Sequence, residues 1–341
     1  MKRPLHAAVS AASSKASIAI AGLAAAMIVL SGCTGEGGAG AGSSAQSDDQ
    51  VTELTVGITP IANAANLYIA IDQGYFDDEG LVVTPSVIQT AATAIPSLLN
   101  DELQLALMTS VPVITAASKG LPVVVASGND RYPVDGVGDT TALIAAPDSG
   151  VSSVEDLADK TVAVVGLKSA PELALRVVLE EAGVDPADVE IVEIAYPDMV
   201  SALQSDRVDA AFVVDPFLSE AEAAGLVPIS QPFTEGLGGM TALTWVAGEQ
   251  FANANPETIT KFTTAIQRAA EYANENPEAV RAVLPTFTSL SPEAIENSVI
   301  PLYDSSLSEA DVENYVELME REGFIEAGYD PSDLLWKTDG D

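Results

Sequence analysis

The stretch that most constrains the fold runs from residue 54 to residue 81. It opens with the alternating, β-rich run LTVGI at residues 54–58, which predicts a strand. Thr59-Pro60 ends that strand, because proline has no N–H for a ladder. Residues 67–71 predict a short helix that Gly74 ends, and a second strand follows at once. The loop from Thr59 to Asn66 should therefore lie at the carboxyl end of the first strand, where open α/β sheets place ligands.

A longer motif covers the second half of this unit. It reads Ala70-x-x-x-Gly74-Tyr75-Phe76-x-x-Glu79-Gly80-Leu81. A first strand, a proline-bearing loop and then this motif resemble the solute-binding proteins of ABC importers, in the branch for nitrate, sulfonates, taurine and thiamin precursors. The resemblance continues to about residue 247 and rests on the order of the pieces. It implies an α/β protein of the type II periplasmic-binding-protein fold, with two α/β lobes joined by a two-strand hinge.

The N-terminus has the pattern of an export signal. Lys2, Arg3 and Lys15 precede an apolar run at residues 18–30, which is too short for the roughly 20 residues that span a bilayer. Leu30-Ser31-Gly32-Cys33 resembles the lipobox of bacterial lipoproteins, which implies a signal peptide at 1–32 and a diacylglyceryl group on Cys33. The alternative is a membrane-anchor helix followed by an unrelated cysteine. Residues 33–50 are rich in Gly, Ser and Ala and predict a flexible tether. The protein is therefore expected outside the cell, lipid-anchored to the outer face of the cytoplasmic membrane.

Composition excludes several classes of function. The chain has 50 acidic and 14 basic residues and a formal net charge of −36, so it should repel nucleic acid and anionic lipid. The one histidine, His6, leaves with the signal, and the one cysteine is Cys33. The mature chain thus has no Ser-His-Asp or Cys-His arrangement and no Cys/His metal site. We expect no enzyme, no cofactor and no metal. The resemblance implies a small-molecule solute and an ABC permease as partners, and we expect a monomer.

The order of the predicted elements indicates an inserted lobe. We predict a first lobe from residues 51–140 and 247–341, and a second lobe at 141–246 with hinge strands at its edges. Two similar strands, TALIA at 141–145 and TALTWV at 241–246, are predicted to be the paired crossings of a clamshell. The alternative is a coincidence of two short strands. After residue 255, apolar residues at helical spacing predict helices that pack on the first lobe.

Seven candidate ligand contacts belong to the first lobe and the hinge. They are Thr59, Pro60, Asn66, Thr109, Ser110, Arg131 and Trp245. The Thr109-Ser110 pair precedes a helix, so it is either a cap or a ligand contact through its hydroxyls and the free helix N–H groups. The resemblance places this position in the cleft. Arg131 lies in a predicted polar loop, 128–133, and is the first lobe's candidate cation.

Five candidates belong to the second lobe: Lys168, Ser169, Tyr196, Asp215 and Phe217. The loop at 166–171 joins a buried strand to a helix N-terminus, which suits an anionic or carbonyl group. The alternative is a solvated lysine and a serine cap. Asp215-Pro216-Phe217 resembles the family's Trp-Glu-Pro-Tyr element without its tryptophan, so Phe217 and Trp245 would complete the aromatic wall. Alternatively, Asp215 caps the next helix, and Tyr196 either contacts ligand or packs.

The resemblance implies capture of a small organic anion of the sulfonate, taurine or nitrate class and its delivery to an ABC importer. Arg131 and Lys168 would carry the anion through charge-assisted hydrogen bonds. If neither does so, the ligand is neutral or cationic, and a pyrimidine or other heterocycle is the alternative. An enzyme on the same fold and a sensory lipoprotein are further alternatives. The export signal and the lack of a histidine in the mature chain argue against the enzyme.

Overall fold

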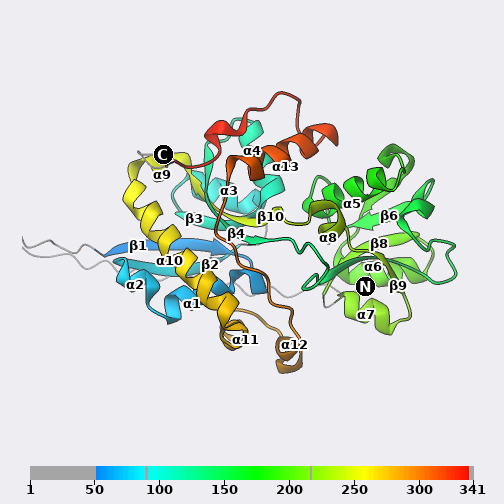
Figure 1. Cartoon of the computed structure of the whole chain (residues 1–341), viewed down its shortest axis with the longest axis horizontal. Helices are drawn as coiled ribbons and strands as arrows, with labels where there is room; N and C mark the ends of the chain where they lie inside the picture. The colour runs from blue at the N-terminus through cyan, green and yellow to red at the C-terminus, as the bar shows by residue number, and fades with distance from the viewer. Residues whose placement is uncertain (1–50, 89–90, 216, 338–341) are drawn as a thin grey trace, which may run out of the picture. The chain divides into compact units, whose positions relative to one another are not determined.

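The computed structural model describes residues 51–88, 91–215 and 217–337. The predicted signal peptide, the tether and Cys33 lie outside the described residues. Within this part, the strands form two five-stranded sheets of mixed direction, each covered by helices (Figure 1).

The first sheet has the strand order β2-β1-β3-β10-β4. β1 pairs in parallel with β2 and β3, whereas β10 is antiparallel to both β3 and β4. The bounds are β1 Thr52–Ile58, β2 Leu81–Val87, β3 Leu105–Thr109, β4 Val123–Arg131 and β10 Thr241–Gly248. The predicted first unit is confirmed, and Gly74 has the left-handed backbone (φ 73°) that lets the chain turn between helices.

The second sheet repeats this plan in the order β7-β6-β8-β5-β9. β6 pairs in parallel with β7 and β8, and β5 is antiparallel to β8 and β9. The bounds are β5 Thr141–Ala145, β6 Thr161–Val164, β7 Glu190–Glu193, β8 Ala210–Val214 and β9 Val227–Ser230. Each sheet thus holds one antiparallel strand in its fourth position.

The two similar strands, predicted to be the paired crossings of the hinge, belong to different sheets: β5 to the second and β10 to the first. Each is the antiparallel strand of its own sheet, and every residue of each is buried. The similar sequences of β5 and β10 therefore reflect the same buried position, fourth in the strand order, in two different sheets. The segments that lie side by side are the end of β4 and the start of β10. Tyr132 N–H donates to Met240 O (3.0 Å), and Gly239 N–H donates to Tyr132 O (3.0 Å).

The predicted polar loop at 128–133 is wrong for residues 128–131, because β4 continues to Arg131. A distant segment, 302–306, pairs with this end of β4. Gly128 N–H donates to Ser305 O (3.1 Å), and Asp304 N–H donates to Asn129 O (3.0 Å). A Cβ on Gly128 would lie 2.5 Å from the backbone oxygen of Ser306, so glycine permits this approach. Pairing with β10 and with this segment satisfies the backbone despite the polar side chains.

The helices of the first half are α1 Ala65–Asp72, α2 Tyr75–Asp78, α3 Ala91–Leu99, α4 Ser110–Ser118, α5 Ala170–Glu181, α6 Tyr196–Gln204, α7 Phe217–Ala223 and α8 Pro232–Leu237. Those that follow are α9 Glu249–Ala254, α10 Pro256–Glu275, α11 Pro277–Val283, α12 Pro292–Glu296 and α13 Glu309–Arg321. α10 packs against α1, α2 and β4 of the first sheet, as predicted (Figure 1). Its buried face includes Ile259, Phe262 and Ile266.

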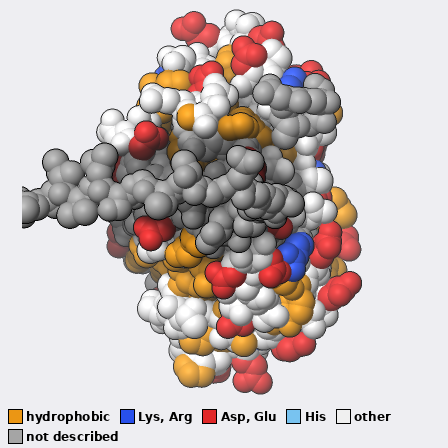
Figure 2. Space-filling model, turned by 90° about the vertical axis from the view of Figure 1, so that its left-hand side faces the viewer, with side chains coloured by type: hydrophobic (Ala, Val, Ile, Leu, Met, Phe, Trp, Pro, Cys, Tyr) orange, Lys and Arg blue, Asp and Glu red, His pale blue; other side chains and the backbone are white. Residues whose placement is uncertain are grey.

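In the part of the chain that the structure describes, no helix combines the length and apolar character needed to cross a bilayer. Figure 2 shows one face of the protein, on which carboxylate side chains are scattered and Lys or Arg side chains are few.

Candidate functional site

The polar candidates of the first sheet meet at one edge. β1, β3 and β4 run in the same direction, and β10 runs against them, so three carboxyl ends and one amino end share that edge. Thr59-Pro60 follows β1, Thr109-Ser110 ends β3 and begins α4, and Arg131 ends β4 opposite Thr241. Loops at such an edge are where α/β sheets bind ligands.

Four side chains at this edge form what we call the amide cluster: Asn63, Asn66, Asn129 and Asp130. Asn63 Nδ2 donates to Asp130 Oδ2 (2.6 Å), and Asn129 Nδ2 donates to Asp130 Oδ1 (2.9 Å) and to Asn63 O (3.0 Å). Asn66 Nδ2 donates to Asn129 Oδ1 (2.8 Å). Asn66 and Asn129 are fully buried, and Asp130 is 2% exposed. Asn66 Oδ1 is buried without a hydrogen-bond partner among the described residues.

Asp130 is a buried carboxyl that forms no ion pair with a Lys or Arg side chain among the described residues. Burial raises its pKa from 3.8 to about 6, although hydrogen bonds from Asn129, Asn63 and the Leu243 backbone lower it. Its charge also acts on the nearby phenols. Burial raises the pKa of Tyr132, Tyr303 and Tyr315 above the ordinary value, and Asp130 raises each further. These phenols therefore stay neutral where Asp130 titrates.

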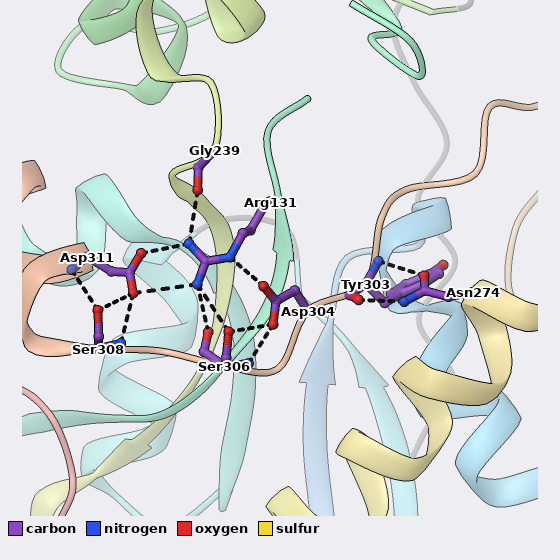
Figure 3. A network of polar contacts seen from close by, with 8 residues as sticks. All are labelled: Arg131, Gly239, Asn274, Tyr303, Asp304, Ser306, Ser308 and Asp311. Carbon is purple, nitrogen blue, oxygen red and sulfur yellow. Dashed lines mark hydrogen bonds and ion pairs between the residues drawn. The ribbon is translucent and has the colours of Figure 1, made fainter. Parts of the chain in front are cut away.

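Arg131, the next residue on β4, lies in a different environment, which we call the arginine cluster: Arg131, Gly239, Asp304, Ser306 and Asp311 (Figure 3). Its Nε donates to Asp304 Oδ2 (2.5 Å), and Nη1 donates to Asp311 Oδ1 (2.6 Å) and Gly239 O (2.9 Å). Nη2 donates to Ser306 O (3.3 Å), Ser306 Oγ (3.2 Å) and Asp311 Oδ2 (3.5 Å). All five guanidinium N–H groups thus have acceptors within the protein.

The two carboxylates of the arginine cluster titrate lower than usual. Burial would raise the pKa of Asp304 and Asp311, but hydrogen bonds from nearby serines and Arg131 bring both below the ordinary value. Arg131 therefore ties the segment around 304–311 to the crossing at Gly239. Its predicted contact with an anion has no free donor in this arrangement.

The other first-sheet candidates differ in their surroundings. Ser110 Oγ donates to Thr241 O (3.1 Å), as does the phenol of Tyr315 (2.8 Å). Thr109 is the N-cap residue of α4, but its side chain makes no capping hydrogen bond. Thr59 is half-buried and Pro60 is exposed. Trp245 is fully buried and packs edge-on against Phe262 (5.2 Å between ring centroids), in the core of the first sheet.

In the second sheet, Lys168 reaches a C-terminal segment. Its Nζ donates to Gly323 O (2.7 Å) and lies 4.5 Å from the centre of the Phe324 ring. Ser169 is the N-cap residue of α5, but its Oγ donates to Gly166 O (2.5 Å) and makes no cap. The predicted cation of this loop is therefore engaged within the protein.

The remaining three candidates lie at the ends of β7 and β8. The rings of Tyr196 and Phe217 stack, with centroids 5.9 Å apart and an interplanar angle of 17°. Asp215 Oδ1 accepts hydrogen bonds from Ser219 N (3.2 Å) and Oγ (2.8 Å), which is the capping alternative. Tyr196 is among the groups that raise the pKa of Tyr132, after burial and the charges of Tyr315 and Asp130.

Several polar groups at this edge escaped the sequence reasoning. Asn63 stands three residues before Asn66, and that spacing alone could have drawn attention to it. The pair Asn129-Asp130 was visible only as loop composition. Nothing in the sequence indicated that Asp304 and Asp311 contact Arg131, because Arg131 is more than 170 positions away from both.

The described structure has hollows beside both sheets. One, an open depression of about 740 Å³, lies on the second sheet's side and is lined by Glu193, Asp198 and Arg207 among others. The other encloses about 10 Å³ beside Ser110, Thr241 and Tyr315, which is room for one water. No group of three or more His, Cys, Asp or Glu side chains within 51–88, 91–215 and 217–337 could hold a metal ion.

Known proteins resemble this chain in sequence and in fold. A family model described as NMT1/THI5 like matches residues 61–280. The taurine-binding periplasmic protein of Escherichia coli (strain K12) is 26% identical over 229 residues, which cover 67% of this chain and 69% of that protein. The formylaminopyrimidine-binding protein of Halalkalibacterium halodurans is 29% identical over 256 residues, which cover 70% and 72%.

Among solved structures, the periplasmic aliphatic sulphonate binding protein of Escherichia coli matches with a TM-score of 0.70 at 18% identity. The match covers 84% of this chain and 97% of that one. It confirms the predicted periplasmic-binding-protein fold.

Proposed function

Because the chain belongs to the NMT1/THI5-like family, we propose that it is an extracytoplasmic solute-binding protein that delivers a small solute to an ABC importer. The observation that carries this proposal is the polar edge of the first sheet. It lies at the crossing between the sheets, where the end of β4 and the start of β10 run side by side. The related proteins named above bind small solutes, which supports a binding role without catalysis.

Two ligand classes follow from these relatives and from the site. A small organic anion of the sulfonate, taurine or nitrate class is supported by the taurine-binding relative. A pyrimidine or other heterocycle is supported by the formylaminopyrimidine-binding relative. The engaged donors of Arg131 and Lys168 favour a ligand that needs no cation from either side chain.

The lobes would close on the solute. We propose that the first lobe includes β10, which lies in the first sheet, and that the second lobe lies between two crossings that bend at Tyr132 and at Gly239-Met240. Closure around bound solute is the form that a permease would recognise. The candidate residues at the polar edge and around Tyr196 are the proposed lining.

The proposed location of the protein rests on the pattern of its N-terminal sequence. We propose cleavage after residue 32, lipidation of Cys33 and a tether at 33–50 that holds a monomer on the outer face of the cytoplasmic membrane. Two or more acyl chains give stable anchoring. The Cys33→Ser variant should lose lipid labelling and leave the membrane fraction, and unchanged fractionation would count against the anchor.

A thermal-shift panel on the full-length chain tests the binding role. The panel contains taurine, alkyl and aryl sulfonates, nitrate, aminopyrimidines and riboflavin. A ligand at 100 times its Kd should stabilise the protein by about 2.7 kcal/mol. A sulfonate shift that disappears in Lys168→Ala, with Lys119→Ala as the exposed control, would support the anion and its predicted contact. A shift from heterocycles alone would remove the anion assignment, and no shift from any class would count against the binding role.

A further inference from the structure

The orientation of the side-chain amides in the amide cluster follows from one acceptor. A carboxylate can only accept hydrogen bonds, so both amides that touch Asp130 must turn their NH2 groups toward it. Asn63 Nδ2 lies 2.6 Å from Asp130 Oδ2, and Asn129 Nδ2 lies 2.9 Å from Oδ1. The second contact of Asn129 Nδ2 is a backbone carbonyl, Asn63 O, which also only accepts.

This constraint passes on to Asn66. With its NH2 turned to two acceptors, Asn129 presents Oδ1 to Asn66, whose NH2 must therefore face it at 2.8 Å. Asn66 Oδ1 is then left without a donor, although the side chain is fully buried. A buried acceptor without a donor is costly, and native proteins rarely leave one unmet.

The same reasoning applies to the exposed side of the cluster. Asn63 is half-buried, and its NH2 is turned to Asp130, so its Oδ1 points away from the carboxylate. No hydrogen bond to Asn63 Oδ1 is present among the described residues. The cluster is therefore short of donors, and it presents amide oxygens rather than amide N–H groups.

The neighbouring cations Arg131 and Lys168 do not supply the donors that the amide cluster lacks. Arg131 directs its five N–H groups to the arginine cluster, and Lys168 directs its ammonium to Gly323 O. A solute that approaches beside Asn63 thus meets acceptors in front of a buried carboxylate.

We infer that this edge binds the N–H-bearing group of the solute, with Asn63 Oδ1 as the acceptor that touches it. Asp130 is a positioning residue that holds the amide of Asn63 in this orientation. The inference rests on the proposed solute-binding function and deepens it. The shared chemistry is an N–H donor, which an aminoalkyl sulfonate presents as an ammonium and an aminopyrimidine as an amino group.

Matched pairs of solutes test the inference by calorimetry on the full-length chain. Taurine is compared with ethanesulfonate, which lacks the amine, and 4-aminopyrimidine with pyrimidine. The donor-bearing member of the pair that binds should do so about 10- to 100-fold more tightly. Asn63→Ala should remove most of this preference and leave the other member's affinity within about twofold. The exposed Asn100→Ala is the control and should change neither affinity.

A pH series separates positioning by Asp130 from a structural role. Below pH 6, a protonated Asp130 can donate, so Asn63 is free to turn its amide over. Neither taurine nor ethanesulfonate titrates between pH 5 and 7.5, and the phenols of Tyr132, Tyr303 and Tyr315 stay neutral there. The other facing groups, Asn63, Asn129 and the Leu243 N–H, do not titrate. In the wild type, the preference for taurine over ethanesulfonate should become smaller as the pH is lowered through 6. In Asp130→Asn, the preference should be small and independent of pH.

Four results would overturn the inference. Equal affinity for both members of each binding pair, or an unchanged preference in Asn63→Ala, would leave the solute-binding role standing without the acceptor site. Tighter binding of the member that lacks the amine would do the same. Failure of the folded protein to bind any of the four solutes would count against the proposed function as well.

Discussion

The arginine cluster and the amide cluster contain neighbouring residues of β4, but they differ in how their hydrogen-bonding groups are paired. Arg131 meets two carboxylates from a distant segment, and its donors are matched by acceptors. Asp130 meets only neutral amides and one backbone N–H, and it leaves acceptors over. The first arrangement resembles a structural tie, whereas the second has the donor deficit of a binding site. Charge type alone does not separate the two roles, because both clusters contain buried or half-buried ions.

Loss of the arginine should have the largest effect on stability. Arg131→Ala leaves Asp304 and Asp311 without their cation, so the free energy of unfolding should fall by about 3 kcal/mol, the low end of the range for buried pairs because these side chains are only partly buried. Urea denaturation measures this. Arg268→Ala is the matched control, because its ion pair with Asp78 is exposed and should be worth less than about 1 kcal/mol. Equal losses in the two variants would contradict the structural role of the arginine cluster.

The pH dependence of stability should show the cost of ionising the buried Asp130 carboxyl in the amide cluster. Asp130 has a folded-state pKa of about 6 against 3.8 ordinarily, so the folded state binds the proton more tightly than the unfolded state. Its contribution is therefore fullest below about pH 4 and is lost as the pH rises through 6, by up to about 3 kcal/mol.

The difference in unfolding free energy between the wild type and Asp130→Asn isolates this contribution. Asp304 and Asp311 have lowered pKa values and act in the other direction, since their stabilisation is lost as the pH falls. Both proteins share that loss, so it cancels. A difference that stays flat from pH 4 to 7 would refute the raised pKa of Asp130.

A smaller loss of stability should follow from a side chain at Gly128 that displaces the segment 302–306 from β4. The Cβ of Gly128→Ala would meet Ser306 O at 2.5 Å, so we expect about 2 kcal/mol of destabilisation. Gly166→Ala is the control, because nothing lies within 4 Å of the added carbon. Chemical denaturation of both variants measures the contrast, and a neutral Gly128→Ala would mean that the segment at 302–306 is not held as described.

The smallest stability effect belongs to the residue proposed to touch the solute. Asn63→Ala removes a hydrogen bond to Asp130 from a half-buried position and should cost about 1 kcal/mol. Thermal unfolding without ligand measures this cost. A loss as large as that of Arg131→Ala would make Asn63 a structural residue and would erase the contrast between the clusters.

Much of the local structure follows from short patterns. The first β–α–β unit, the turn at Gly74 and the buried face of α10 were all predictable, because strand alternation, helix periodicity and glycine conformation act over a few residues. Ser308 begins α13 with a capping box completed by Asp311, again a local signal. The resemblance to binding proteins also led to the correct fold.

Other features depended on contacts between distant parts of the chain. The sequence alone carried the strand and helix pattern, the acidic composition, the family motif and the two similar strands at 141–145 and 241–246. Tertiary structure decided that those strands enter different sheets, that β4 continues through polar residues, and that Arg131 pairs with Asp304 and Asp311. The reason is physical. The sheet that a strand joins depends on strands distant in the sequence, and the last two outcomes depend on a segment more than 170 residues from Arg131, whose backbone partners and carboxylates no local pattern can indicate.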